Sequence, residues 1–205
     1  MNLSEFDFPF DPALIASEPV LPRHAARLLC LDRRSGVLSH RQVVDLPDLL
    51  EPGDVLVVND TKVLAARVSG RKQPAGTAVD VLFVRDHGDA VWDVLLKGRF
   101  RVGQTIQFDG DVCATVVQRD EAGTKIRVAS PVPVVDFLRA HGRMPLPPYI
   151  KRSAQPEDRV WYQTCFADRE GAIAAPTAGL HFTPELMARL RARGVATAEI
   201  GRAHV

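Results

Sequence analysis

Three features are scarce in this sequence, and each absence excludes a class of protein. The 205 residues hold only three cysteines, Cys30, Cys113 and Cys165, which are far apart and form no C-x-x-C pair. They predict free thiols in a reducing compartment, and they exclude a disulfide framework and a cysteine zinc site. No apolar run approaches the length of a membrane span, and the N-terminus lacks the apolar core of a signal peptide. We therefore expect a cytoplasmic protein that binds neither a membrane nor a metal.

Net charge is the third scarce feature, since 26 basic and 25 acidic residues leave a formal charge of +1. This balance argues neither for nor against a nucleic-acid partner, because a local basic patch can still form. Hydrophobic residues make up 46% of the chain, which is enough for a core, and 205 residues suit one domain or two small ones. Fifteen prolines and fourteen glycines favour short helices and strands over long ones.

The N-terminal part predicts a hairpin, a helical turn and a buried strand. Residues 27–31 favour a strand, and a turn at 32–36 returns the chain as a hairpin. A leucine-rich helical turn follows at 46–50. Residues 55–58 form a continuous apolar run between turn signals, which is typical of a strand covered on both faces. We also expect the three phenylalanines near the N-terminus to dock the proline-rich arm onto a core.

The middle of the chain has a different character. From 67 to 128, short alternating runs recur between Gly, Asp and Pro turns, which predicts a small antiparallel barrel or sandwich. Residues 131–143 then predict a short helix, and the proline-rich segment 144–152 predicts a stiff extended return between two domains.

A small basic cluster interrupts this β-rich block, where Lys97, Arg99 and Arg101 surround Gly98. Side chains of this kind can contact phosphates. The alternative is a solvated turn without a ligand.

Polar residues follow the predicted strand at 55–58, in the order Asn59, Asp60, Thr61 and Lys62. Ligand contacts in α/β proteins commonly lie just past the carboxyl end of such a strand. The alternative is an Asx-type turn made by Asn59 and Asp60. The sequence leaves both interpretations open.

The segment 171–186 combines a loop of small residues, one histidine and a marked helix start. The loop residues have so little bulk that a ligand can approach their backbone; they are Pro176, Thr177, Ala178 and Gly179. His181 follows, and then Thr183 and Pro184 have the residue types of a helix N-cap and first helical position. The alternative is a tight strand-to-helix connection in which His181 packs in the core.

Several motifs occur in a characteristic order along the chain. They are Asn59-Asp60-Thr61-Lys62-Val63 with Ala66-Arg67, Met144-Pro145-Leu146-Pro147-Pro148-Tyr149-Ile150, Tyr162-Gln163-Thr164, and the run from Gly171 to Thr183. This combination resembles the S-adenosylmethionine:tRNA ribosyltransferase-isomerase family of queuosine biosynthesis. The resemblance covers residues 1 to about 199.

The resemblance implies a fold that agrees with the β-rich block found independently. The expected fold is a larger α/β (α+β) domain, incomplete here, with an inserted small antiparallel β-barrel domain. We expect the larger domain at 1–66 and 146–199, and the barrel at 67–145.

The resemblance also implies an enzyme and its substrates. The family transfers and isomerises the ribosyl part of S-adenosylmethionine onto 7-aminomethyl-7-deazaguanine at the wobble position of the tRNA anticodon. The product is epoxyqueuosine, and adenine and methionine leave. S-adenosylmethionine is then a co-substrate, no prosthetic group or metal is required, the anticodon stem-loop is the partner, and family precedent points to a monomer.

Roles for individual residues follow from that chemistry. Removal of the proton next to the sulfonium needs a base with a pKa near the operating pH, which favours His181, with Asp60 as the other candidate. Lys62 and Arg67 are expected to hold phosphate or a developing oxyanion. The remaining expected substrate-binding residues are Asn59, Thr61, Tyr149, Pro176, Thr177, Ala178 and Gly179. Tyr149 or Tyr162 is expected to stack on a base. Packing or surface roles remain the alternative for each.

The C-terminal residues depart from the family pattern. Residues 200–205 correspond to codons ATC-GGA-AGA-GCA-CAC-GTC, which resemble a sequencing adapter, and we expect them to be an artefact joined to a truncated reading frame. The alternatives to an active enzyme are an inactive fragment, a non-catalytic tRNA-binding module and a stand-alone small-molecule binding domain.

Overall fold

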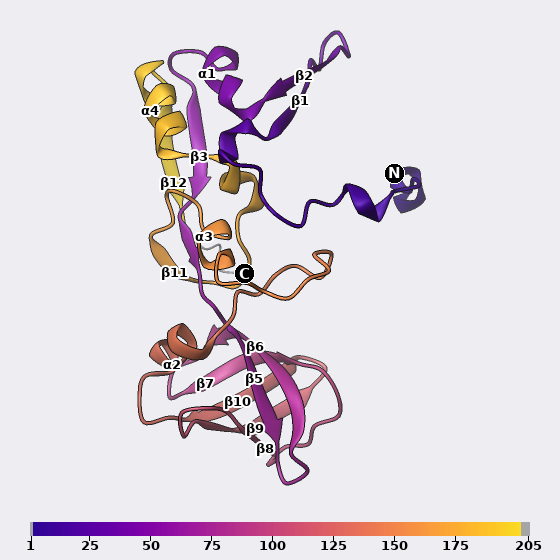
Figure 1. Cartoon of the computed structure of the whole chain (residues 1–205), viewed down its shortest axis with the longest axis vertical. Helices are drawn as coiled ribbons and strands as arrows, with labels where there is room; N and C mark the ends of the chain where they lie inside the picture. Colours follow the sequence, from indigo (N-terminus) through magenta and orange to yellow (C-terminus); the bar gives the residue numbers. More distant parts are fainter. Residues whose placement is uncertain (1, 202–205) are drawn as a thin grey trace.

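The protein consists of a mixed α/β part, built from both ends of the chain, and a closed antiparallel β-barrel built from its middle. Figure 1 shows the barrel beneath the α/β part and the N-terminal arm projecting to one side. The structure is a computed structural model and describes residues 2–201. The expected fold class is confirmed. None of the described helices is long and apolar enough to cross a membrane.

The N-terminal arm is extended and ends in a hairpin. It carries three short 3-10 helices, η1 Leu3–Phe6, η2 Pro12–Leu14 and η3 Arg23–Ala25, before strands β1 Arg27–Leu31 and β2 Leu38–Gln42. The two strands pair antiparallel, which confirms the predicted hairpin.

The phenylalanines of this arm do not dock onto a core in the described part of the chain, so that prediction is wrong. Phe6, Phe8 and Phe10 are 61%, 72% and 52% exposed. Prolines punctuate the arm and keep it extended, so these rings stay in solvent.

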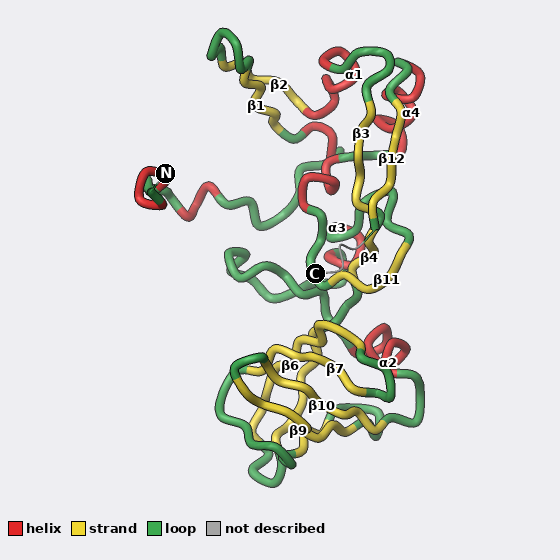
Figure 2. Tube along the Cα trace, turned by 180° about the vertical axis from the view of Figure 1, so that it is seen from behind, coloured by secondary structure: helices red, strands yellow, loops and turns green. Residues whose placement is uncertain are grey.

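Two parallel strand pairs form the centre of the α/β part, as Figure 2 shows from behind. Strand β3 Val55–Asn59 pairs with β12 Ala196–Ile200, and β4 Thr61–Val63 pairs with β11 Arg169–Ala172. The helical elements of this part are η4 Val43–Asp45, α1 Leu46–Leu49, α3 Asp158–Trp161, η5 Thr177–His181 and α4 Pro184–Ala192. The expectation for residues 200–205 falls largely outside the described residues; Ile200 pairs with Asn59 at the end of β12.

Strand β3 is covered on one face, so the prediction of two covered faces is wrong. Val58 is 5% exposed and Leu56 packs against the cluster built on α4, whereas Val55 and Val57 are 59% and 56% exposed. Alternate side chains of a strand point to opposite faces. Helix packing therefore buries one set and leaves the other in solvent.

Helix α4 forms as its sequence predicts. The Thr183 hydroxyl accepts a hydrogen bond from the Leu186 amide at 3.3 Å, and Pro184 occupies the first turn. Gly194 ends the helix with a φ of +86°, which glycine adopts without strain. Leu186, Met187 and Leu190 are buried against Val43 and Val195 and form the core of the α/β part.

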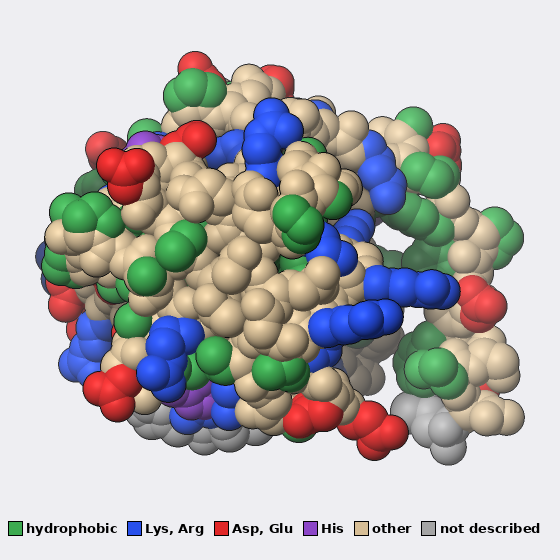
Figure 3. All heavy atoms as spheres, turned by 90° about the horizontal axis from the view of Figure 1, so that it is seen from below, with side chains coloured by type: hydrophobic (Ala, Val, Ile, Leu, Met, Phe, Trp, Pro, Cys, Tyr) green, Lys and Arg blue, Asp and Glu red, His purple; other side chains and the backbone are tan. Residues whose placement is uncertain are grey.

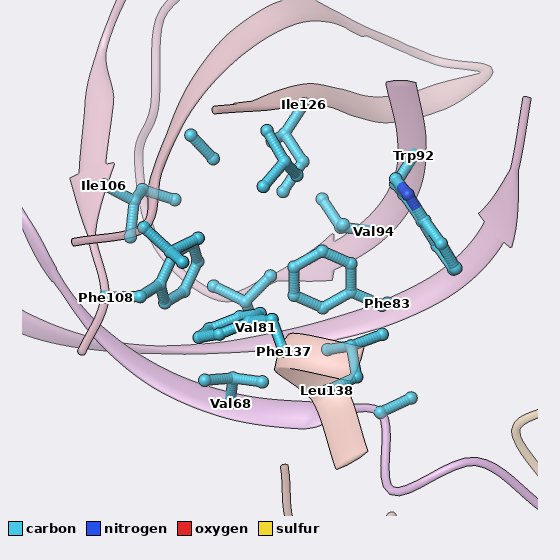
Figure 4. Packing of buried hydrophobic residues seen from close by; sticks show 14 of the residues in the cluster. Val68, Val81, Phe83, Trp92, Val94, Ile106, Phe108, Ile126, Phe137 and Leu138 are labelled. Atoms are coloured by element: carbon cyan, nitrogen blue, oxygen red, sulfur yellow. The ribbon is translucent and has the colours of Figure 1, made fainter. Parts of the chain in front are cut away.

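The barrel closes in the strand order β10-β7-β6-β5-β8-β9. Its strands are β5 Arg67–Lys72, β6 Thr77–Asp86, β7 Val91–Leu96, β8 Thr105–Gln107, β9 Cys113–Asp120 and β10 Gly123–Ala129. Alternate side chains fill the interior, and Figure 4 shows Phe83, Ile106 and Phe108 meeting there. Helix α2 Val134–His141 covers one opening with Phe137 and Leu138, both under 3% exposed.

The chain leaves and re-enters the α/β part at one place. Arg67 and Arg143 exchange backbone hydrogen bonds of 3.2 and 2.8 Å, so the first barrel residue lies beside the returning strand. Gly142 precedes this contact, and a Cβ built there lies 1.7 Å from the Ala65 carbonyl oxygen. Only glycine allows the two segments to come this close.

We expect Gly142→Ala to destabilise the protein by about 3 kcal/mol or more, because the added methyl group must push the two segments apart. Urea unfolding followed by the fluorescence of buried Trp92 measures this as a lower midpoint. Glu121→Ala, an exposed change in a barrel turn, is the control. Equal midpoints for the two variants would contradict the role of Gly142.

Candidate active site

Two adjoining cavities lie where the segment 143–154 passes between the barrel and the α/β part. Both are lined by Tyr149, Ile150, Arg152, Tyr162 and Thr177, so they lie side by side, and together we call them the cleft. We call the cavity of about 320 Å³ the aromatic cavity and that of about 840 Å³ the basic cavity.

The aromatic cavity is lined by rings and by the end of the N-terminal arm. Its aromatic residues are Tyr149, Trp161, Tyr162 and His181, and residues 15–20 form the opposite wall. Burial raises the pKa of the Tyr162 hydroxyl, so the phenol remains a hydrogen-bond donor at neutral pH. A cavity that combines flat rings with polar side chains suits a purine nucleoside.

The basic cavity gathers cations from the barrel and from the returning segment. Arg67, Lys97 and Arg143 line it from the barrel side, with Asp80 as the one carboxylate among its described lining residues. Arg143 Nη2 lies 2.8 Å from Asp80 Oδ1, and Arg67 Nη1 lies 4.0 Å from Asp80 Oδ2. Arg67 Nε is buried and has no hydrogen-bond partner among the described residues. The excess of cations over carboxylates in this cavity suits an anionic group.

A buried ion pair positions the segment that carries Tyr149. The Arg152 guanidinium donates two hydrogen bonds of 2.7 Å to the Asp158 carboxylate, which is 0% exposed. Asp158 also accepts from the Gln155 amide at 2.7 Å. These bonds, chiefly those from Arg152, hold the pKa of Asp158 below its usual value. Arg152 further donates to the Ser17 carbonyl at 3.0 Å and so fixes the arm at the cleft.

Two more side chains fix the walls of the cleft. The Gln163 amide bonds Val63 in both directions, accepting from its N–H at 3.0 Å and donating to its carbonyl at 2.7 Å. Arg23 donates to the carbonyls of Gln163, Val160 and Leu180. The Gln163 side chain therefore pairs with the Val63 backbone of β4 in the way that a neighbouring strand does. Arg23 connects the N-terminal arm to the end of η5.

Comparison with known proteins identifies the family. Residues 3–203 match the family model of the queuosine biosynthesis protein. The chain belongs to this family. It is 39% identical over 202 residues to the S-adenosylmethionine:tRNA ribosyltransferase-isomerase of Sulfurihydrogenibium, and 46% identical over 206 residues to that of Moorella thermoacetica. The alignments cover 98% of this chain, and 60% and 59% of those proteins.

This member of the queuosine biosynthesis protein family thus spans about three fifths of the length of the curated relatives it matches. Among solved structures, it is similar to the S-adenosylmethionine tRNA ribosyltransferase of Thermotoga maritima. The sequence identity is 30% with a TM-score of 0.40, over 97% of this chain and 57% of that one.

The cleft contains six of the residues singled out from sequence. His181 and Thr177 come from η5, Tyr149 from the returning segment and Tyr162 from the end of α3. Arg67 lies at the start of β5, and Lys97 follows β7. His181 is exposed at the rim of the aromatic cavity rather than packed in the core. The alternative interpretation, in which His181 packs in the core, is therefore wrong.

The four polar residues from Asn59 to Lys62, which span the end of β3 and the start of β4, are not among the lining residues of these two cavities. Asn59 Oδ1 accepts from the amide and the hydroxyl of Thr61 at 2.9 and 2.5 Å, which is the Asx-type turn that the sequence left open. Lys62 Nζ lies 4.0 Å from Glu170 Oε1 on the surface of β4.

Asp60 is 2% exposed, and its Oδ2 lies 3.2 Å from Arg169 Nε. Its Oδ1 is buried without a hydrogen-bond partner among the described residues. The carboxylate therefore stands at the carboxyl ends of β3 and β12, apart from the cavity that His181 lines.

The small residues before His181 have different environments. Pro176 precedes η5, and Ala178 is exposed. A Cβ at Gly179 would lie 2.9 Å from the Phe166 ring and 3.0 Å from Thr164, so protein atoms fill that side of the loop. Glycine at this position thus serves packing of η5 against Phe166. Within the described residues, no group of three His, Cys, Asp or Glu side chains is close enough to hold a metal.

Three positioning residues of the cleft were not predicted: Arg23, Arg152 and Gln163. Gln163 belongs to the Tyr162-Gln163-Thr164 motif, so its place in the sequence pointed to it. Arg23 and Arg152 bond chiefly to distant backbone or to a buried carboxylate, and no local spacing reveals such partners.

Asp158→Asn should destabilise the protein by about 3 kcal/mol at pH 7, because it leaves Arg152 without its carboxylate. The lowered pKa of Asp158 means that its contribution is complete above the unfolded-state pKa of about 3.9 and is lost as pH falls towards the folded-state value. The difference in unfolding free energy between the wild type and the variant should therefore shrink below about pH 4. Urea unfolding between pH 7 and pH 3.5 measures it, and a difference that stays constant with pH would contradict the ion pair.

Proposed function

We propose that this chain carries the substrate cleft of an S-adenosylmethionine:tRNA ribosyltransferase-isomerase. The proposed reaction transfers and isomerises the ribosyl part of S-adenosylmethionine onto 7-aminomethyl-7-deazaguanine at the tRNA wobble position, giving epoxyqueuosine, adenine and methionine. The observation that carries the proposal is that an aromatic cavity lined by His181 adjoins a cationic cavity and shares lining residues with it. The names of the curated relatives support the same reaction.

The aromatic cavity suits the adenosine of S-adenosylmethionine. Its rings, those of Tyr149, Trp161 and Tyr162, offer faces for an adenine to stack on. The cavity volume of about 320 Å³ is at the lower end of the range typical of small-molecule sites. Thr177 lies on the wall shared with the basic cavity, where its hydroxyl is available to a ribose oxygen.

His181 is the proposed general base. It removes the proton from the carbon next to the sulfonium, which is acidified by the adjacent positive charge, and the same imidazole then returns a proton to the departing adenine. Its exposed position at the cavity rim lets it exchange protons with solvent between the two steps. Asp60 lies outside the aromatic cavity lining and is the less favoured base.

The basic cavity suits a phosphate of the anticodon stem-loop. Arg67 lines this cavity, and the Arg143 guanidinium there is held by Asp80 and Ser69, so both side chains offer donors to such a group. Fixed donors recognise a phosphate at a smaller entropic cost than free surface lysines. The proposal places the acceptor base beside Tyr149, one of the residues that line both cavities. We further infer a cytoplasmic monomer that needs no metal or prosthetic group, as the family resemblance implies.

His181→Gln should lower S-adenosylmethionine-dependent adenine release by about a hundredfold or more, because the amide cannot accept and return a proton. The assay supplies tRNA that carries the aminomethyl base and follows adenine by chromatography. His40→Gln, an exposed histidine on the hairpin, is the control. Near-normal release by the His181 variant would eliminate it as the base. Binding of tRNA by the wild type without any adenine release would instead support a non-catalytic tRNA-binding module.

A further inference from the structure

A second cationic concavity lies on the barrel, in the loop that joins β7 to β8. Phe100 is 8% exposed and anchors this loop in the barrel wall. The Lys72 ammonium lies 4.7 Å from the centre of its ring, and the Arg119 guanidinium lies 5.7 Å from it. The ring thus holds two cations, one from β5 and one from β9, beside the loop.

Hydrogen bonds fix these cations to the loop backbone. Lys72 Nζ donates to the Arg99 carbonyl at 2.6 Å, and Arg119 Nη2 donates to the Gly98 carbonyl at 2.8 Å. The Arg101 amide donates to Gln104 Oε1 at 2.9 Å. The loop is therefore held in one conformation and is not a freely moving solvated turn.

The concavity beside this loop has a volume of about 530 Å³ and contains no carboxylate among its described lining residues. Its four cations are Lys72, Arg99, Arg101 and Arg119. Within residues 2–201, none of the four has a carboxylate oxygen within 4.0 Å. Like charges this close repel one another, so an unneutralised group of four, two of which are held by the loop backbone, favours a polyanion.

The surface around this group is not uniformly basic. Figure 3 views the molecule from the barrel end and shows Lys and Arg side chains in separate groups among Asp and Glu. With a net charge of only +1, the attraction for a polyanion has to be local. The loop is one of the places where positive charge is concentrated.

The position of Lys97 indicates which polyanion binds here. Lys97 lines the basic cavity, and the next residue, Gly98, lines the second concavity. The loop therefore contributes residues to both the cleft and the second concavity. Because Phe100 is buried, no exposed ring is offered to stack on a base, so phosphates rather than bases are the contacts.

We propose that the loop 97–101, with Lys72 and Arg119, binds the sugar–phosphate backbone of the tRNA next to the phosphate held in the cleft. This site rests on the proposed function for the identity of its RNA. It positions the stem without reading its sequence, and it makes binding strongly dependent on salt.

The test is the double variant Arg99→Gln/Arg101→Gln. Both side chains are exposed and make no hydrogen bond or ion pair to a described residue, so the barrel keeps its contacts. The probe is an unmodified tRNA transcript titrated at 50 to 200 mM KCl. We expect roughly tenfold weaker binding at the lowest salt, and a slope of log affinity against log salt that is reduced by about 1.4 to 1.8.

Two controls separate a local phosphate site from general charge and from misfolding. Arg33→Gln/Arg34→Gln removes the same charge at the hairpin turn and should leave the slope unchanged. Arg99→Lys/Arg101→Lys keeps the charge and should restore most of the affinity. An unchanged slope in the glutamine variant, an equal loss in the hairpin control, or no RNA binding by the wild type would each overturn the site.

Adenine release distinguishes failure of this site from failure of the proposed function. Wild-type binding that depends on Arg99 and Arg101 but yields no adenine would support the phosphate site and contradict the enzyme. Adenine release with an unchanged salt slope would support the enzyme and contradict the site.

Discussion

The arrangement of the barrel and the α/β part depends on one constraint: the chain enters the barrel and returns from it at the same point. The backbone bonds between Arg67 and Arg143 satisfy this constraint, and Gly142 allows the approach. The Gln163 amide then ties the entering segment at Val63 to the motif that follows the return. Arg159, which donates to the Gly142 carbonyl, and the Arg139–Glu170 ion pair add further contacts between the barrel side and the α/β part.

The cleft follows from that constraint. The returning segment runs between the two parts, so its residues have the barrel on one side and η5 with the N-terminal arm on the other. Barrel residues supply the cations, and the α/β part supplies the rings and His181. The buried Arg152–Asp158 pair is costly to desolvate and gains little net stability. Its role is to fix the segment that carries Tyr149 and, through Ser17, the N-terminal arm.

Local patterns predicted much of this from sequence. The hairpin, the barrel block, helix α4 and its Thr183 cap follow from periodicity, turn residues and capping, which act over a few neighbouring positions. The exposed face of β3 was missed, because an apolar run shows that a strand can be buried but not what covers it. The order of the motifs indicated His181 and Tyr149 as site residues. The bonds of Arg23 to carbonyls about 140 residues away in the sequence could not be predicted from local residue spacing.

Amide hydrogen exchange with S-adenosylmethionine, in the absence of tRNA, tests the central claim that the cleft is the co-substrate site. The account predicts slower exchange in residues 15–20, 149–152 and 177–181, which line the aromatic cavity, and unchanged exchange in the barrel strands β8 and β9. Slower exchange confined to the region around Asp60 and the ends of β3 and β12, with the cleft segments unaffected, would contradict it.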